Sequence, residues 1–151
     1  MRAFITPDPK RVIASAQRTF DIETHALQEL RGRLNDNLVK AVGLLLNCKG
    51  RVVVTGIGKS GHIARKIAAT LASTGTPAFF MHAAEALHGD LGMITEDDLV
   101  IALSYSGKAQ ELITVLTVTR RLGIKLIAMT GNDQSELAQS ADLHLDVHIE
   151  Q

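Results

Sequence analysis

The side chains best suited to chemistry lie in two short polar segments, each of which directly follows an apolar run. Residues 56–61 read GIGKSG, and residues 104–111 read SYSGKAQE. Backbone N–H groups at the start of a helix, combined with hydroxyl and ammonium groups, bind a compact anion. Each segment is therefore predicted to form a small anion site.

The first segment matches parts of two longer phosphate-binding motifs without completing either. A P-loop needs a glycine five residues before Gly58, and that position is Val53, inside the apolar run. A dinucleotide site needs an acidic residue at the end of the second strand, where this sequence has His82 and reaches its first acid at Glu85. The segment is therefore predicted to hold one phosphate, with Gly58 and Ser60 among its ligands.

The second segment places two hydroxyl groups, Ser104 and Ser106, ahead of a glycine and a helix start. In a doubly wound sheet the first and third loops can be neighbours where the strand order reverses, so both segments are expected to face one phosphomonoester. Glu111 falls in the first turn of the following helix and is a candidate general base. The alternative is a purely structural carboxylate, which the helix dipole stabilises at that position.

Three more side chains are candidates at the same edge. Lys59 would stabilise negative charge on a reacting oxygen or hold the phosphate, and the alternative is a solvated charge. His82 ends a predicted strand and His88 follows six residues later, so both are assigned to substrate contact, with a structural histidine as the alternative. The two histidines could share a metal, but the sequence fixes no third ligand.

These residues must be positioned by a repeating pattern of strands and helices. Continuous apolar runs, separated by helical patterns, recur at the spacing of βαβ units and indicate a parallel sheet covered on both faces. Right-handed crossovers then place every βα loop at the carboxyl edge. The predicted strands are Val52–Thr55, Ala78–His82, Leu99–Ser104, Leu126–Thr130 and Leu143–His148.

The predicted fold is thus an α/β fold, a five-stranded, doubly wound parallel sheet flanked by helices, in residues 51–151. Residues 1–50 are expected to form an N-terminal helical arm that packs on this core. No helix follows the last predicted strand, and we expect the chain to be part of a longer protein.

Composition restricts the partners. Among the 151 residues, 16 are basic and 16 acidic, so the net charge gives no reason to expect nucleic acid or an anionic membrane. No apolar run is long enough to span a membrane. The single cysteine, Cys48, excludes an internal disulfide and fits a cytoplasmic location.

The motifs together resemble the sugar isomerase (SIS) family. TGIGKSGH and SxSGxxxE match its two phosphate-binding elements, and STGTP with HAAEALHGDLGM (82–93) is similar to the arabinose-5-phosphate isomerases in particular. The resemblance covers about residues 10–151. It implies a flavodoxin-like α/β sandwich, a homotetramer, and interconversion of D-arabinose 5-phosphate and D-ribulose 5-phosphate through a cis-enediol. It further implies a place in carbohydrate metabolism that feeds lipopolysaccharide synthesis.

The resemblance also implies a role for each site residue. Lys59 and Glu111 correspond to catalytic residues, and no cofactor is required. His82 is additionally associated with an inhibitory zinc. The implied ligands of the substrate and its phosphate are Gly58, Ser60, His82, His88, Ser104 and Ser106.

Two departures from the family pattern bear on pathway and activity. Tyr105, Lys108 and Ala109 stand where the common motif has Asn, Glu and a hydroxyl residue, a variant similar to the paralogue associated with glucitol utilisation. The family's later glutamate, catalytic histidine and CBS domains are not found in this sequence, so the chain alone is expected to be poorly active. The alternative function is a non-catalytic, sugar-phosphate-sensing regulatory domain. The arm has no helix-turn-helix and no basic stripe, which favours the enzyme.

Overall fold

The computed structural model describes residues 6–150, so residues 1–5 and 151 of the predicted domains lie outside the described part. Leu34–His148 form one compact unit, and the residues before and after them form another. In the latter unit, α1 (Pro9–Arg33) begins directly after Asp8, whose Oδ1 accepts from Lys10 N–H at 3.0 Å, and proline suits the first helical position. The predicted boundary between arm and core at residue 50 stays a prediction.

The unit Leu34–His148 contains a five-stranded, all-parallel sheet in the order β2-β1-β3-β4-β5, which confirms the predicted fold class. From β1 the chain adds β2 on one side, and it then returns to add β3, β4 and β5 on the other side. The strand order therefore reverses at the β1–β3 pair. The strands are β1 (Val52–Gly56), β2 (Ala78–His82), β3 (Leu99–Leu103), β4 (Lys125–Thr130) and β5 (Leu143–Asp146).

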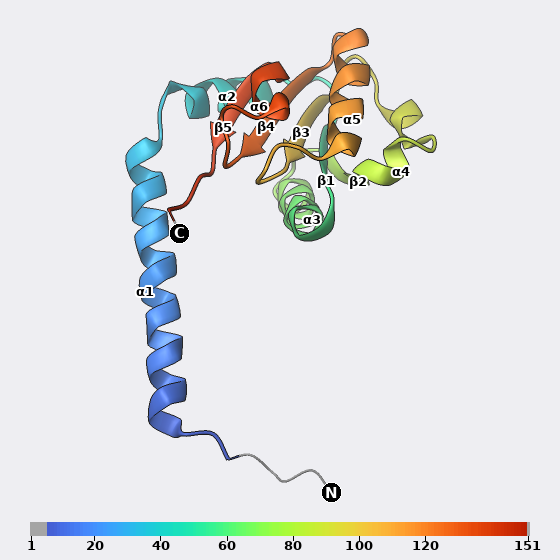
Figure 1. The fold of residues 1–151 in the computed structure, drawn as a ribbon. Coiled ribbons are helices and arrows are strands. Elements are labelled where there is room, and N and C mark those ends of the chain that lie inside the picture. Colours follow the sequence, from blue (N-terminus) through green and yellow to red (C-terminus); the bar gives the residue numbers. More distant parts are fainter. Residues whose placement is uncertain (1–5, 151) are drawn as a thin grey trace, which may run out of the picture. The chain divides into compact units, whose positions relative to one another are not determined.

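Helices cover both faces of this sheet (Figure 1). Because strand side chains alternate between faces, Val52 and Val54 pack with α2 and α3, whereas Val53 packs with α4, α5 and α6. The helix bounds are α2 (Asp36–Leu46), α3 (Gly58–Ser73), α4 (Ala83–Ala86), α5 (Gln110–Arg121) and α6 (Glu136–Ser140).

Several boundaries differ from the predicted ones for local reasons. In the predicted helical arm, α2 ends at Leu46, four residues before residue 50, and the Asn47 side chain caps this end by donating to Gly43 O at 2.8 Å. β5 ends at Asp146 rather than His148, since Asp146 Oδ1 accepts from His148 N–H at 2.8 Å and turns the chain. After β2, the chain forms the short α4 and a 3₁₀ turn, η1 (Asp90–Met93), which the sequence pattern did not indicate.

At the amino edge of the sheet, one buried carboxylate joins two segments of the chain. Asp98 accepts from Arg51 N–H at 2.6 Å, from Thr95 N–H at 2.8 Å and from the Arg51 guanidinium at 3.2 Å. The same guanidinium donates to Met93 O at 2.5 Å. These bonds tie the start of β1 to the turn that leads into β3. Among residues 6–150, no helix is long and apolar enough to cross a membrane.

Candidate active site

The two predicted anion-binding segments leave the sheet from adjacent positions. Gly56, the last residue of β1, is paired with Leu103, the last residue of β3. α3 then crosses one face of the sheet and α5 crosses the other. A crevice outside the carboxyl ends of two such strands is where doubly wound proteins bind ligands. The structure therefore brings the glycine segment and the serine segment to one place.

The glycine segment forms a tight turn from β1 into α3. A Cβ on Gly56 would lie 3.1 Å from the Ser60 carbonyl carbon, and one on Gly61 would lie 3.0 Å from Gly56 O, so strand and helix approach more closely than side chains allow. Gly58 has a φ of 54°, which favours glycine. α3 begins without a side-chain cap, so the N–H groups of its first turn, around exposed Lys59 and half-buried Ser60, can bind an anion.

In the serine segment, both hydroxyl oxygens already accept backbone hydrogen bonds. Ser104 Oγ accepts from Gly107 N–H at 3.1 Å, and Ser106 Oγ accepts from Lys108 N–H at 3.4 Å. Within the described residues neither hydroxyl proton has an acceptor, so each can be donated to a phosphate oxygen. Glu111 follows, half-buried in the first turn of α5, which also lacks a side-chain cap.

The loop after β4 supports the serine segment. Met129 O accepts from Ser104 N–H at 3.1 Å, Gly131 N–H donates to Tyr105 O at 2.9 Å, and Leu137 N–H donates to Gly107 O at 3.3 Å. Gly107 has a φ of 64°, and any side chain there would collide with Ser135, the N-cap of α6. Sequence reasoning missed this support, although Gly131 directly after β4 and Ser135 before the next helix could have indicated it.

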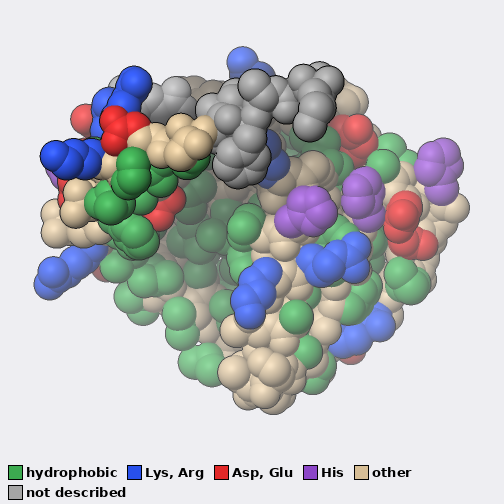
Figure 2. Space-filling view, turned by 90° about the horizontal axis from the view of Figure 1, so that it is seen from below, with side chains coloured by type: hydrophobic (Ala, Val, Ile, Leu, Met, Phe, Trp, Pro, Cys, Tyr) green, Lys and Arg blue, Asp and Glu red, His purple; other side chains and the backbone are tan. Residues whose placement is uncertain are grey.

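The two histidines occupy different surroundings. His82 is paired with Gly56 across the sheet and caps α4, since its Nδ1 accepts from Ala84 N–H at 3.3 Å. In this arrangement the ring proton of the neutral imidazole is on Nε2, which can donate to a bound sugar. His88 is exposed at the turn after α4, where its N–H donates to Glu85 O at 2.8 Å. Figure 2 shows histidine side chains close to Lys or Arg side chains on one face of the molecule.

A metal site is not defined by these histidines. Among the described residues, no three His, Cys, Asp or Glu side chains are grouped to hold an ion. An inhibitory zinc at His82 therefore stays a prediction, and it would bind at Nε2 only if that nitrogen lost its proton.

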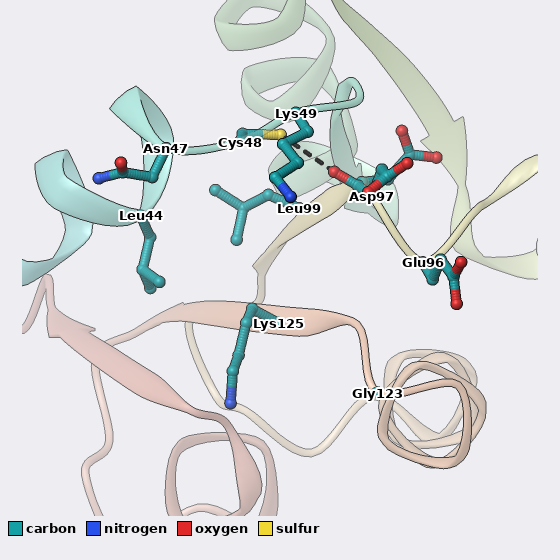
Figure 3. Close-up of a pocket in the computed structure, with 10 residues that line it drawn as sticks. Leu44, Asn47, Cys48, Lys49, Glu96, Asp97, Leu99, Gly123 and Lys125 are labelled. Atoms are coloured by element: carbon teal, nitrogen blue, oxygen red, sulfur yellow. Dashed lines mark hydrogen bonds between the residues drawn. The ribbon is translucent and has the colours of Figure 1, made fainter.

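An open pocket of about 280 Å³ lies at the opposite, amino edge of the sheet (Figure 3). Its lining mixes the charges of Lys49 and Lys125 with those of Glu96 and Asp97, and Cys48 Sγ donates to Asp97 O at 3.6 Å. Parallel sheets carry their ligand chemistry at the carboxyl edge. None of the predicted site residues lines this pocket, so we do not assign it to the reaction.

Comparisons with known proteins agree with this geometry. The SIS domain family matches residues 45–151. The arabinose 5-phosphate isomerase KdsD of Pseudomonas aeruginosa is 59% identical and GutQ of Escherichia coli K12 is 50% identical, each over 92% of this chain. The chain spans 43% of the length of either relative. A solved structure from Escherichia coli CFT073, in complex with arabinose 5-phosphate, is 40% identical with a TM-score of 0.90, covering 95% of this chain and 77% of that one.

Proposed function

This chain belongs to the SIS domain family, and we propose that the protein is an aldose–ketose isomerase that interconverts D-arabinose 5-phosphate and D-ribulose 5-phosphate. The observation that carries the proposal is the meeting of two anion-binding loops at the point where the strand order reverses. The names of the relatives KdsD and GutQ, and the sugar phosphate in the related structure, support the choice of substrate.

The phosphate is bound between the start of α3 and the serine segment. Ser60, Ser104 and Ser106 donate hydroxyl protons to it, and the N–H groups of Gly58 and its neighbours add the partial positive charge of a helix start. Both helices begin without a side-chain cap, so these donors are not already used by a capping side chain. The phosphate end of the substrate is thereby held in place, and these groups leave the reacting carbons C1 and C2 unbound.

Isomerisation moves one proton from C2 to C1. Glu111 takes the C2 proton of the open-chain aldose, which leaves a cis-enediolate with the negative charge on the C1 oxygen. The C2 hydroxyl proton then passes to the C1 oxygen, and the Glu111 carboxyl, whose proton exchanges with solvent, protonates C1 to give the ketose. The Lys59 ammonium stabilises the negative oxygen between these two steps. His82 donates from Nε2 to a sugar oxygen, and His88 contacts the substrate from the turn after α4. No cofactor takes part, and zinc bound at His82 would inhibit by removing that donor.

We extend the proposal to a cytoplasmic homotetramer that supplies pentose phosphate for lipopolysaccharide or a related glycan. The SYSG variant of the serine segment leaves the pathway open to a glucitol-linked role. The alternative function is a non-catalytic domain that senses a sugar phosphate.

The deciding experiment incubates the intact gene product with a panel of pentose and hexose phosphates in D₂O and follows them by NMR. We expect interconversion of arabinose 5-phosphate and ribulose 5-phosphate, with deuterium entering at the carbon that receives the proton. Binding of arabinose 5-phosphate without turnover would support the sensor instead. Turnover of a hexose phosphate alone would contradict the proposed substrate.

A further inference from the structure

The ring of Tyr105 lies directly against the backbone of Gly131. An ideal Cβ on Gly131 would be 2.5 Å from Tyr105 Cε2 and 2.7 Å from Cζ, well inside van der Waals contact. Gly131 is not among the residues with positive φ, so its own backbone conformation does not require glycine. The Tyr105 ring can therefore keep this position only because residue 131 has no side chain.

The same two residues are also joined through their backbones, since Gly131 N–H donates to Tyr105 O at 2.9 Å. This bond fixes the base of the Tyr105 side chain relative to Gly131. A new side chain at residue 131 would have to rotate the ring away or displace the backbone that carries it. Tyr105 stands between Ser104 and Ser106, so displacement of its backbone would alter the segment that carries both hydroxyl groups, and rotation of the ring would remove its packing from that segment.

We propose that Tyr105 and Gly131 are paired positioning residues for the phosphate-binding serines. The ring packs on bare backbone and, with the bond from Gly131 N–H, holds the serine segment in the shape that presents both hydroxyl protons to a phosphate. The identity of the ligand rests on the proposed function. The contact itself is a property of the free protein, and it can be tested without any ligand.

The test is a double-mutant cycle on the intact gene product, with Gly131→Ala, Tyr105→Ala and both together. We expect Gly131→Ala to weaken the Kd for arabinose 5-phosphate about tenfold when Tyr105 is present, and by about twofold or less in the Tyr105→Ala background, since contacting residues couple. Tyr105→Phe keeps the ring and should retain the full sensitivity to Gly131→Ala. Gly43→Ala is the matched control, because a Cβ there meets nothing within 4 Å.

A second measurement does not need the ligand. Gly107 N–H donates to Ser104, and its hydrogen exchange in the free protein reports the shape of the serine segment. Exchange should accelerate about tenfold in Gly131→Ala. Adding Tyr105→Phe should not restore slow exchange, because the ring is kept, whereas adding Tyr105→Ala should restore it.

Equal effects of Gly131→Ala with and without the Tyr105 ring, on exchange or on Kd, would overturn the proposal. Failure of the unmodified protein to bind any pentose phosphate would overturn the proposed function alone, since the exchange measurement would still report on the contact.

Discussion

Lys59 lies in the first turn of α3, where its ammonium group and the helix N–H groups can act on the same substrate. Replacing it with alanine removes one preorganised charge, so we expect Lys59→Ala to lower turnover of arabinose 5-phosphate about 10²-fold or more. The residue is exposed and the neighbouring glycines are kept, so the thermal midpoint should not change. Lys66→Ala, at an exposed position two turns along α3, is the control. Near-normal turnover in folded Lys59→Ala would remove the residue from the mechanism.

Ser104 and Ser106 are expected to act on the phosphate and on no other part of the sugar. Because each hydrogen bond to a charged group contributes about 1.5–3 kcal/mol, the double variant Ser104→Ala, Ser106→Ala should bind arabinose 5-phosphate much more weakly. Binding of unphosphorylated arabinose should be unchanged, which calorimetry with both ligands can check. Ser73→Ala, at the exposed end of α3, controls for the loss of a serine. An equal loss for both ligands would mean that the serines only shape the loop.

Thr55 is a buried residue of β1 whose hydroxyl oxygen has no hydrogen-bond partner within the described part of the chain. An unpaired buried hydroxyl destabilises the folded state, so Thr55→Val should raise the free energy of unfolding by about 1 kcal/mol or more. Thr119→Val is the matched control, since Thr119 is equally buried but donates to Leu116 O at 2.9 Å. Urea denaturation of both variants decides the matter. A loss of stability in Thr55→Val as large as in Thr119→Val would show that the hydroxyl is paired.

At the scale of the elements, the strands could be predicted to within about two residues because the first four are apolar runs that a glycine or polar residue ends. β5 reads LHLD, the least apolar of the five, and its end was predicted two residues too late. The parallel order and the meeting of the first and third loops followed from right-handed crossovers. The candidate site residues, Glu111 and the serines among them, could be proposed because they lie at helix starts, which bind anions whatever the remaining fold.

Other features depend on contacts that no local pattern records. α4 has only four residues, too few for a periodic apolar pattern to record, and it begins where the His82 ring accepts the N–H of Ala84. The support of the serine segment by Gly131 and Ser135 likewise depends on two loops that are distant in sequence. The fine geometry around the candidate site was therefore beyond sequence reasoning, even where candidate residues could be proposed.

Asp98 makes the amino edge of the sheet sensitive to acid. Burial alone would raise the pKa of this carboxyl, but the hydrogen bonds from Thr95 N–H, Arg51 N–H and the Arg51 guanidinium outweigh burial and hold the pKa below its ordinary value. A depressed pKa contributes stability above the pKa of the unfolded chain, about 3.9, and that stability is lost as the pH falls through the lower folded value.

We therefore expect Asp98→Asn to lower the free energy of unfolding at pH 7 by about 1.5–3 kcal/mol, the range for hydrogen bonds to a charged group. The variant should also lose less stability than the unmodified protein between neutral pH and about pH 3, because the titrating carboxyl is gone. Denaturant titrations across this range give both quantities. Asp97→Asn, at the exposed neighbouring position, controls for the change in net charge. Identical pH profiles for Asp98→Asn and the unmodified protein would contradict this account.

At the scale of the whole molecule, α2 is apolar on two opposite faces. Ala41 and Leu45 pack against the sheet, whereas Val39 and Leu46 lie 70% and 81% exposed on the outer side. An exposed apolar helix face of this kind is typical of a surface that another protein chain covers. This exposed face supports the proposed self-association. The sheet and the candidate site both lie within one chain and do not by themselves require a second copy.

If a second copy covers this outer face, charges placed on it should separate the subunits. We expect Val39→Lys with Leu46→Lys to lower the mass measured by light scattering during gel filtration from a tetramer toward a dimer or monomer. Lysine is a good helix former, and at residue 46 its charge also suits the helix C-terminus, so the helical circular dichroism should be kept. Lys40→Gln, at an exposed position on the same helix, should leave the mass unchanged. A tetramer that persists in the double variant would place the subunit contact elsewhere, and a monomer before any substitution would contradict the proposed assembly.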